Sequence, residues 1–137
     1  MNRDIWLNKT EVIRRCLRRI DEEYAGDGRN LLNFTKQDSI ILNLQRCCEA
    51  SIDLAMHTVA ELQIGIPQTS RDAFDLLLKQ NIIGEELTRN LKAMVGFRNI
   101  AVHDYQAVQL EILKAILDKH LGDFKEFTDA LKEYSAQ

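Results

Sequence analysis

Proline and glycine are scarce in this sequence, and their scarcity limits the number of turns that the chain can make. Among 137 residues there is one proline, Pro67, and there are six glycines. Tight turns and helix breaks depend heavily on these two residue types, so a chain with few of them must run in long elements. No stretch shows the alternation of apolar and polar residues that is typical of a strand. The sequence therefore predicts an all-α fold.

The sequence also has few cysteines and a small net charge. The three cysteines are an odd number, lack the spacing of a zinc site, and are expected to stay reduced. Eighteen lysines and arginines against 21 aspartates and glutamates give a net charge of −3. This balance excludes a generally basic nucleic-acid coat, so any contact with RNA must use a local patch of positive charge.

Long apolar runs are absent as well. No segment approaches the ~20 apolar residues that span a bilayer. Six charged residues stand where a signal peptide would be apolar: Arg3, Asp4, Lys9, Glu11, Arg14 and Arg15. We therefore expect a cytoplasmic protein without membrane contact. The length fits one domain over residues 1–137, because soluble domains usually have about 100–150 residues.

Apolar residues recur at the three- and four-residue spacing of buried helix faces over most of the chain. This periodicity predicts helices from about Asn8 to Tyr24, from Lys36 to about Gln63, after Ser70, from Glu85 into Phe97, and from Val108 to Gln137 with Gly122 as a bend. Thr35 and Ser70 are expected as N-terminal caps, and Pro67 follows the second helix, which it cannot continue. The predicted architecture is a bundle of four or five helices.

The side chains best suited to chemistry gather between the fourth and last expected helices. They are Arg98, Asn99, His103 and Tyr105. Imidazole exchanges a proton near neutral pH, and guanidinium carries a permanent charge that holds phosphate oxygens. Asn99 and His103 share a helix face, whereas Arg98 and His103 lie about 140° apart unless the helix loosens. A chain turn around His103 would bring all four side chains to one rim.

This set of residues fits RNA cleavage, in which the 2′-hydroxyl of the substrate is the nucleophile. The protein then supplies only proton transfer and charge stabilisation. No carboxylate cluster with metal spacing accompanies the set, so we expect neither a metal nor another cofactor. The residue types alone also allow a structural role, in which Arg98 caps a helix end while His103 and Tyr105 pack partly buried.

Residues 98–105 read Arg-Asn-Ile-Ala-Val-His-Asp-Tyr, which resembles the Arg-xxxx-His-x-Tyr signature of the HepT family in the HEPN superfamily. The similarity runs from about Ile5 to Phe127 and includes residues 94–97, the stretch 44–55 and the Ile-Pro pair at 66–67. The resemblance implies a homodimeric HEPN-type bundle. It also implies a metal-independent ribonuclease that is the toxin of a two-gene toxin–antitoxin module.

The resemblance further implies a role for each signature residue. Arg98 and His103 would be catalytic and Asn99 supporting, with two copies of the motif meeting across the dimer interface in one cleft. The partner would be an MntA-type minimal nucleotidyltransferase antitoxin, which uses ATP to transfer AMP to Tyr105 and so silences the nuclease. The alternative is a non-enzymatic helical module that binds nucleotide or RNA and serves only as the partner of such a nucleotidyltransferase.

Several other charged residues have two interpretations that the sequence leaves open. Four arginines of the first helix form either the local patch for RNA or a solvated face paired with acidic neighbours: Arg14, Arg15, Arg18 and Arg19, with Asp21, Glu22 and Glu23. Glu49 and Asp53 either orient Arg98 or are ordinary surface charges. We interpret His57 and His120 as surface histidines.

Overall fold

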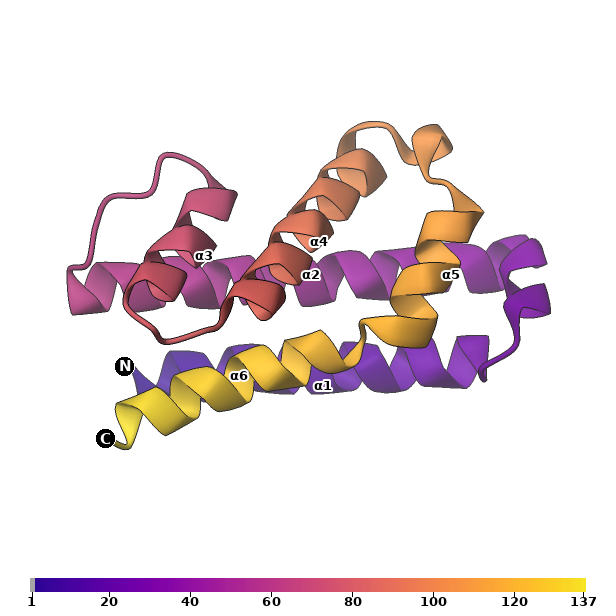
Figure 1. Cartoon of the computed structure of the whole chain (residues 1–137). Coiled ribbons are helices and arrows are strands. Elements are labelled where there is room, and N and C mark those ends of the chain that lie inside the picture. Colours follow the sequence, from indigo (N-terminus) through magenta and orange to yellow (C-terminus); the bar gives the residue numbers. More distant parts are fainter. Residues whose placement is uncertain (1) are drawn as a thin grey trace.

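The computed structural model describes residues 2–137, and all its regular elements are helices (Figure 1). The α-helices of this range are α1 (Arg3–Tyr24), α2 (Phe34–Leu62), α3 (Ser70–Lys79), α4 (Glu85–His103), α5 (Leu110–Lys119) and α6 (Gly122–Ser135). Two short 3₁₀ helices are η1 (Gly28–Leu32) and η2 (Tyr105–Ala107). The expected all-α fold is confirmed. Six α-helices form rather than four or five, because the chain breaks at His120 and Leu121 and divides the last expected helical segment.

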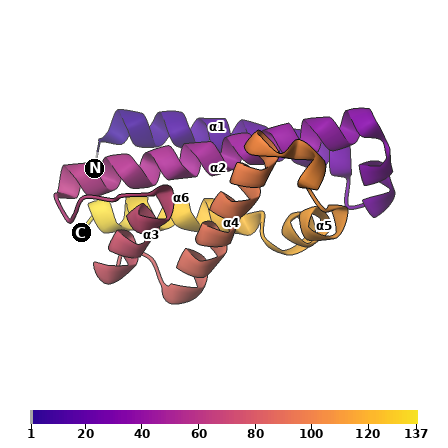
Figure 2. The same cartoon turned by 90° about the horizontal axis from the view of Figure 1, so that it is seen from above.

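The long helices α1 and α2 form an antiparallel pair that runs the length of the molecule. Helix α6 lies along this pair, and the two ends of the chain meet at the same end of the bundle (Figures 1 and 2). Helices α3 and α4 cross α2 obliquely, and α5 lies beyond the C-terminal end of α4 (Figure 2). The last turn of α4 is thereby brought over the first half of α2.

The core consists of two apolar clusters, one at each end of the α1–α2 pair. Small buried residues on α2, Ala50, Ser51 and Ala55, allow its neighbours to approach closely. Phe74 and Phe127 pack edge to face, with ring centroids 5.5 Å apart. The aromatic stripe of α6 is therefore part of the core. The three cysteines are buried and unpaired, as the sequence predicted.

The helices begin at residues other than those expected, because the caps differ. Asn2 caps α1, so this helix starts at Arg3 and includes Trp6, whose indole Nε1 donates to the carbonyl of Thr128 at 3.0 Å. Asn33 rather than Thr35 caps α2, since its side chain accepts from the backbone N–H of Lys36 at 3.1 Å. Thr69 rather than Ser70 caps α3, in a capping box with Asp72.

Helix α4 extends beyond the expected boundary near Phe97. No residue between Phe97 and His103 interrupts its hydrogen bonds, and the backbone leaves helical geometry only at Asp104, with φ −151° and ψ 66°. The signature residues Arg98, Asn99 and His103 therefore lie within the last turns of α4 rather than in a connection. Across the described part of the chain, no helix has the length and apolar character that crossing a membrane requires.

Candidate active site at the end of α4

Arg98 is held against α2 by a carboxylate. Its Nη2 donates to Oε2 of Glu49 at 3.3 Å, and its Nη1 donates to Oδ1 of Asn99 at 3.2 Å. The side chain is 28% exposed, so the guanidinium is anchored yet still reaches solvent. Its Nε is buried without a hydrogen-bond partner, which costs about 1–3 kcal/mol for a buried donor. A guanidinium that is anchored on one side and still partly exposed to solvent is suited to holding an anion.

His103 is the last residue of α4, and its side chain is exposed to solvent. Asp104 follows it, and the Asp104 backbone N–H donates to the carbonyl of Ile100 at 2.8 Å. The imidazole can therefore reach a ligand at the surface without any movement of the core. Asn99 lies one helical turn before His103 on the same face of α4 and is half-buried through its contact with Arg98.

Tyr105 lies in η2, just after α4, and contacts α2. Its hydroxyl donates a short hydrogen bond to Oδ1 of Asp38, a residue of the first turns of α2. Partial burial, together with this bond to a carboxylate, raises the pKa of Tyr105 to about 12. The phenol therefore keeps its proton at neutral pH. The residue is 41% exposed, so a partner protein can approach it.

The structure brings the four predicted site residues to the same end of α4, but only some of them are in contact with one another. Arg98 and Asn99 are hydrogen-bonded. Arg98 and His103 are five residues apart on a continuous helix and point about 140° away from each other. The turn expected around His103 occurs one residue later, at Asp104, and α4 stays helical up to His103. One chain therefore does not present Arg98 and His103 on a single face.

Of the two carboxylates that the sequence leaves open as partners of Arg98, only Glu49 makes that contact. Glu49 orients Arg98, and Gln45 in turn donates to Glu49 at 2.9 Å. Asp53, which had the same two interpretations, bonds to Lys9 of α1 at 3.1 Å instead. The partner of Tyr105, Asp38, was not singled out. Its only sequence signal is its position on the exposed side of α2, in helical register with Glu49.

The other charged groups and histidines that the sequence singled out lie at the surface. Arg14 pairs with Glu11 at 2.6 Å, whereas Arg15, Arg18 and Arg19 line a groove between α1 and α2. His57 is exposed, and His120 approaches Asp123 at 3.1 Å. Within residues 2–137, no three His, Cys, Asp or Glu side chains are grouped so that they could hold a metal ion.

Comparison with known proteins shows which family and which solved structures this chain is similar to. A family model described as Ribonuclease HepT-like matches residues 13–131. The mRNA nuclease HepT of Shewanella oneidensis is 52% identical over 129 residues, which are 94% of this chain and 97% of that protein. A solved structure of tri-AMPylated Shewanella oneidensis HEPN toxin in complex with MNT antitoxin matches with a TM-score of 0.90 and 54% identity, over 97% of this chain and 99% of that chain. A crystal structure of a toxin–antitoxin with AMP-PNP also has a TM-score of 0.90, with 53% identity over 95% of this chain and 98% of that chain.

The helical bundle, with Arg98 and His103 on the last turns of α4, has the HEPN-type architecture. The chain belongs to the Ribonuclease HepT-like family. The resemblance that residues 98–105 indicated is thereby confirmed over most of the chain.

Proposed function

We propose that this protein is the ribonuclease toxin of a toxin–antitoxin module and acts in the cytoplasm. It shares 52% of its residues with an mRNA nuclease across 94% of its length. The observation that carries the proposal is the end of α4, where Glu49 anchors the partly exposed Arg98 and His103 is exposed to solvent. A phosphate anchor and a proton-transfer group thus lie on the same helix end.

The reaction uses the substrate's own nucleophile. The 2′-hydroxyl of RNA attacks the neighbouring phosphorus, the new O2′–P bond forms, and the P–O5′ bond breaks. A proton leaves the 2′-oxygen and another joins the departing 5′-oxygen, and His103 exchanges one of them. Arg98 stabilises the negative charge that builds on the phosphate. The product is a 2′,3′-cyclic phosphate.

One chain supplies one His103, whereas this cleavage uses two proton-transfer groups. We infer a two-fold homodimer, which places a second copy of the α4 end opposite the first. It would also resolve the 140° separation, because Arg98 of one chain can then act beside His103 of the other. Val102 next to His103 and Ile100 on the same helix are apolar and about two-fifths exposed, as an interface requires.

Control of the nuclease acts through Tyr105. The antitoxin partner is an MNT-type nucleotidyltransferase that holds ATP. The Tyr105 oxygen attacks the α-phosphorus, the bond to the pyrophosphate breaks, and the phenolic proton passes to the carboxylate of Asp38, which already accepts a hydrogen bond from it. The resulting AMP group adds bulk and negative charge two residues from His103, so it repels the RNA backbone and blocks the cleft.

An assay with purified protein tests the ribonuclease function. Single-stranded RNA incubated with the protein in EDTA should be cut to fragments that end in 2′,3′-cyclic phosphate, and DNA of the same sequence should stay intact because it lacks the 2′-hydroxyl. Loss of cutting on chelation that Mg²⁺ restores would contradict this mechanism. The alternative, a non-enzymatic partner of a nucleotidyltransferase, would bind RNA or nucleotide without cutting.

The modification site is tested separately with Tyr105→Phe. This variant should remain toxic when expressed alone and should escape neutralisation by the antitoxin, because no oxygen is left to receive AMP. After incubation of the wild type with antitoxin and ATP, mass spectrometry should find the adduct on the peptide that contains Tyr105. An adduct on another residue, or full protection of cells that express Tyr105→Phe, would show that the control site is elsewhere.

A further inference from the structure

A groove lined by arginines runs between α1 and the first half of α2. It has a volume of about 700 Å³ and is lined on one side by Arg15, Arg18 and Arg19 of α1 and on the other by Arg46 of α2. Four arginines therefore line one groove in a protein whose net charge is −3. Like charges repel each other, so this clustering favours the presence of an anionic ligand.

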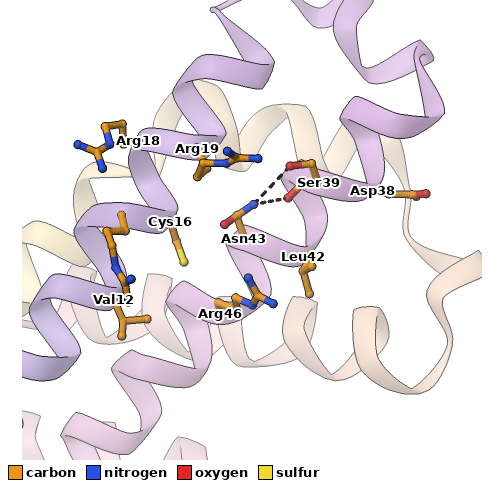
Figure 3. Close-up of a pocket in the computed structure, with 10 residues that line it drawn as sticks. Val12, Cys16, Arg18, Arg19, Asp38, Ser39, Leu42, Asn43 and Arg46 are labelled. Carbon is orange, nitrogen blue, oxygen red and sulfur yellow. Dashed lines mark hydrogen bonds between the residues drawn. The ribbon is translucent and has the colours of Figure 1, made fainter.

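Little of the positive charge of the groove is paired within the protein, although Glu11, which binds Arg14, also interacts electrostatically with Arg15 and Arg18. Over the described residues, no ion pair joins any of these four arginines to an aspartate or glutamate. Arg14, the neighbouring arginine that is paired, is bound to Glu11 and lies outside the groove. Asp38 is the one carboxylate of the lining, but it accepts the Tyr105 hydroxyl and points away from the groove (Figure 3).

The interior of the groove offers neutral polar groups rather than aromatic ones. Figure 3 shows Arg19 extending across the groove toward Asn43 and Ser39, with the Cys16 sulfur facing the same space. The Asn43 amide is fixed by a 2.8 Å hydrogen bond to the Ser39 carbonyl. Because the lining holds no aromatic side chain on which a base could stack, this surface is suited to phosphates rather than to bases.

The groove adjoins the candidate active site along α2. At one end, Asp38 belongs to the groove lining and also holds Tyr105. Further along α2, Arg46 lies one helical turn before Glu49, which anchors Arg98. A strand that leaves the reacting phosphate at the end of α4 therefore needs to cross only the exposed side of α2 to reach the arginines.

We propose that this groove binds the phosphodiester backbone of the RNA substrate, next to the bond that is cut at the end of α4. The inference rests on the proposed ribonuclease function and adds to it a second, sequence-independent binding site that positions the strand. Arg15, Arg19 and Arg46 are the principal phosphate contacts. The Arg18 side chain extends away from the groove (Figure 3). An oligo-AMP adduct on Tyr105 would also be a single-stranded phosphodiester chain. It is therefore the competing occupant of this groove.

RNA binding tests the site directly. A protein carrying His103→Ala binds a fluorescent single-stranded RNA without cutting it, and the anisotropy is measured over a range of salt concentrations. Adding Arg15→Gln, Arg19→Gln and Arg46→Gln should lower the salt dependence of log K by about 0.7 for each phosphate that the variant no longer neutralises. Affinity at 0.1 M salt should fall by about two orders of magnitude, because these arginines act through counterion release.

A matched triple variant controls for the loss of charge. Arg14→Gln, Arg29→Gln and Arg89→Gln remove the same charge from exposed positions outside the groove. We expect this control to keep most of the wild-type salt dependence. Equal salt dependence in the two triple variants would overturn the proposed site. All six arginines are exposed, so unchanged thermal unfolding confirms that any difference arises from binding.

Cleavage kinetics with His103 intact separate the groove from the catalytic residues. The groove triple variant should lower kcat/KM for a long RNA chiefly through a higher KM, and it should cut a dinucleotide, which is too short to reach the groove, at the wild-type rate. An equal loss on both substrates would show that the arginines act at the reacting phosphate and would overturn the proposed position. A wild type that cuts no RNA would instead overturn the proposed function itself.

Cys16 provides a probe inside the groove. The neighbouring Cys47 side chain, together with the charges of Arg46 and Arg15, lowers the pKa of Cys16 to about 7, whereas burial raises the pKa of Cys48 to about 12. Iodoacetamide should therefore modify Cys16 first, since the thiolate is the reactive form. Bound RNA should slow this reaction, and an unchanged rate would contradict occupation of the groove.

One further measurement distinguishes the two phosphodiester chains that fit the groove, the RNA substrate and an AMP chain on Tyr105. Wild type and groove triple variant are incubated with the antitoxin and ATP, and their intact masses give the number of AMP groups added. The proposal expects equal numbers. A shorter AMP chain on the variant combined with unchanged RNA affinity would assign the groove to the adduct and overturn its assignment to the substrate.

Discussion

Glu49 is the residue that determines where the Arg98 guanidinium lies, and it does so with a partly exposed ion pair. Replacing it by Gln should leave the free energy of unfolding within about 1 kcal/mol of the wild type, because exposed ion pairs contribute little. The rate of RNA cleavage should fall by up to about 10²-fold, since a misplaced catalytic group loses its alignment. Thermal melts and kcat measure the two effects.

Asp53→Asn is the matched control for Glu49→Gln. It removes a carboxylate from the same helix, but that carboxylate bonds to Lys9 rather than to Arg98. Its cleavage rate should remain near that of the wild type. If the two variants lose activity equally, Glu49 has no particular role in positioning Arg98.

We expect Asp38 to set the rate at which Tyr105 accepts AMP. Asp38→Asn keeps an oxygen that can accept a hydrogen bond, but it loses the ability to take up the phenolic proton. Removing the carboxylate would also lower the raised pKa of Tyr105, since hydrogen bonding to Asp38 is one of its causes. We expect proton acceptance to matter more, so AMP transfer by the antitoxin should slow by about 10²–10⁴-fold.

Intact mass measured over time, with antitoxin and ATP present, checks this prediction. Asp53→Asn again serves as the control, and it should be modified at the wild-type rate. Faster modification of Asp38→Asn would mean that the carboxylate merely shields the hydroxyl and is not its proton acceptor.

Spacing along the chain predicts the candidate site residues but not their partners. Arg98, His103 and Tyr105 lie within eight residues, so a local signature identifies them. Glu49 lies 49 residues from Arg98, and Asp38 lies 67 residues from Tyr105. Those contacts exist because α4 crosses α2 at one particular place, and that crossing depends on packing that no local pattern contains.

At the scale of the elements, periodicity located the helices more reliably than it located their ends. An apolar stripe persists over many residues, whereas an end depends on one side chain and on the backbone angles around it. Thr35 is a good capping residue, but Asn33 stands where the backbone is extended, with φ −87° and ψ 115°, and it makes the capping hydrogen bond. The continuation of α4 to His103 was missed because Phe97 ends its apolar pattern without ending its hydrogen bonds.

The two cap candidates of α2 give a direct test of its start. Asn33→Ala should reduce the free energy of unfolding by about 1 kcal/mol, the usual loss for a helix cap. Thr35→Ala should change it by no more than about 0.5 kcal/mol, because Thr35 is an exposed residue of the first turn. Chemical denaturation measures both variants. A larger loss for Thr35→Ala would show that α2 begins two residues later.

At the scale of the whole molecule, composition was enough to predict the fold class. Scarce proline and glycine, together with helical periodicity, required a helical bundle, and such a bundle forms. The order in which its helices pack, including α6 along the α1–α2 pair, depends on long-range complementarity and was not predicted. The sequence predicted only one side of the groove between α1 and α2. It indicated the arginines of α1 as a candidate patch, but not Arg46 of α2.

The proposed homodimer is a property of the whole molecule. Light scattering at micromolar concentration should give about twice the chain mass of 15.8 kDa. A second copy is needed because one chain offers one His103 and turns Arg98 away from it. Val102→Glu, which places a charge beside the motif, should shift the mass toward the monomer and reduce cleavage in parallel. A wild-type monomer that cleaves RNA would contradict the composite site.

The central claim, that the end of α4 is a ribonuclease active site, is tested most directly by the rate at which purified His103→Ala cuts RNA. His103 is exposed at a helix end, so its loss should cost at most about 1 kcal/mol of stability. The rate should fall by about 10²–10⁴-fold, as expected when a proton-transfer group is removed. A folded His103→Ala protein that cuts RNA at nearly the wild-type rate would contradict the claim.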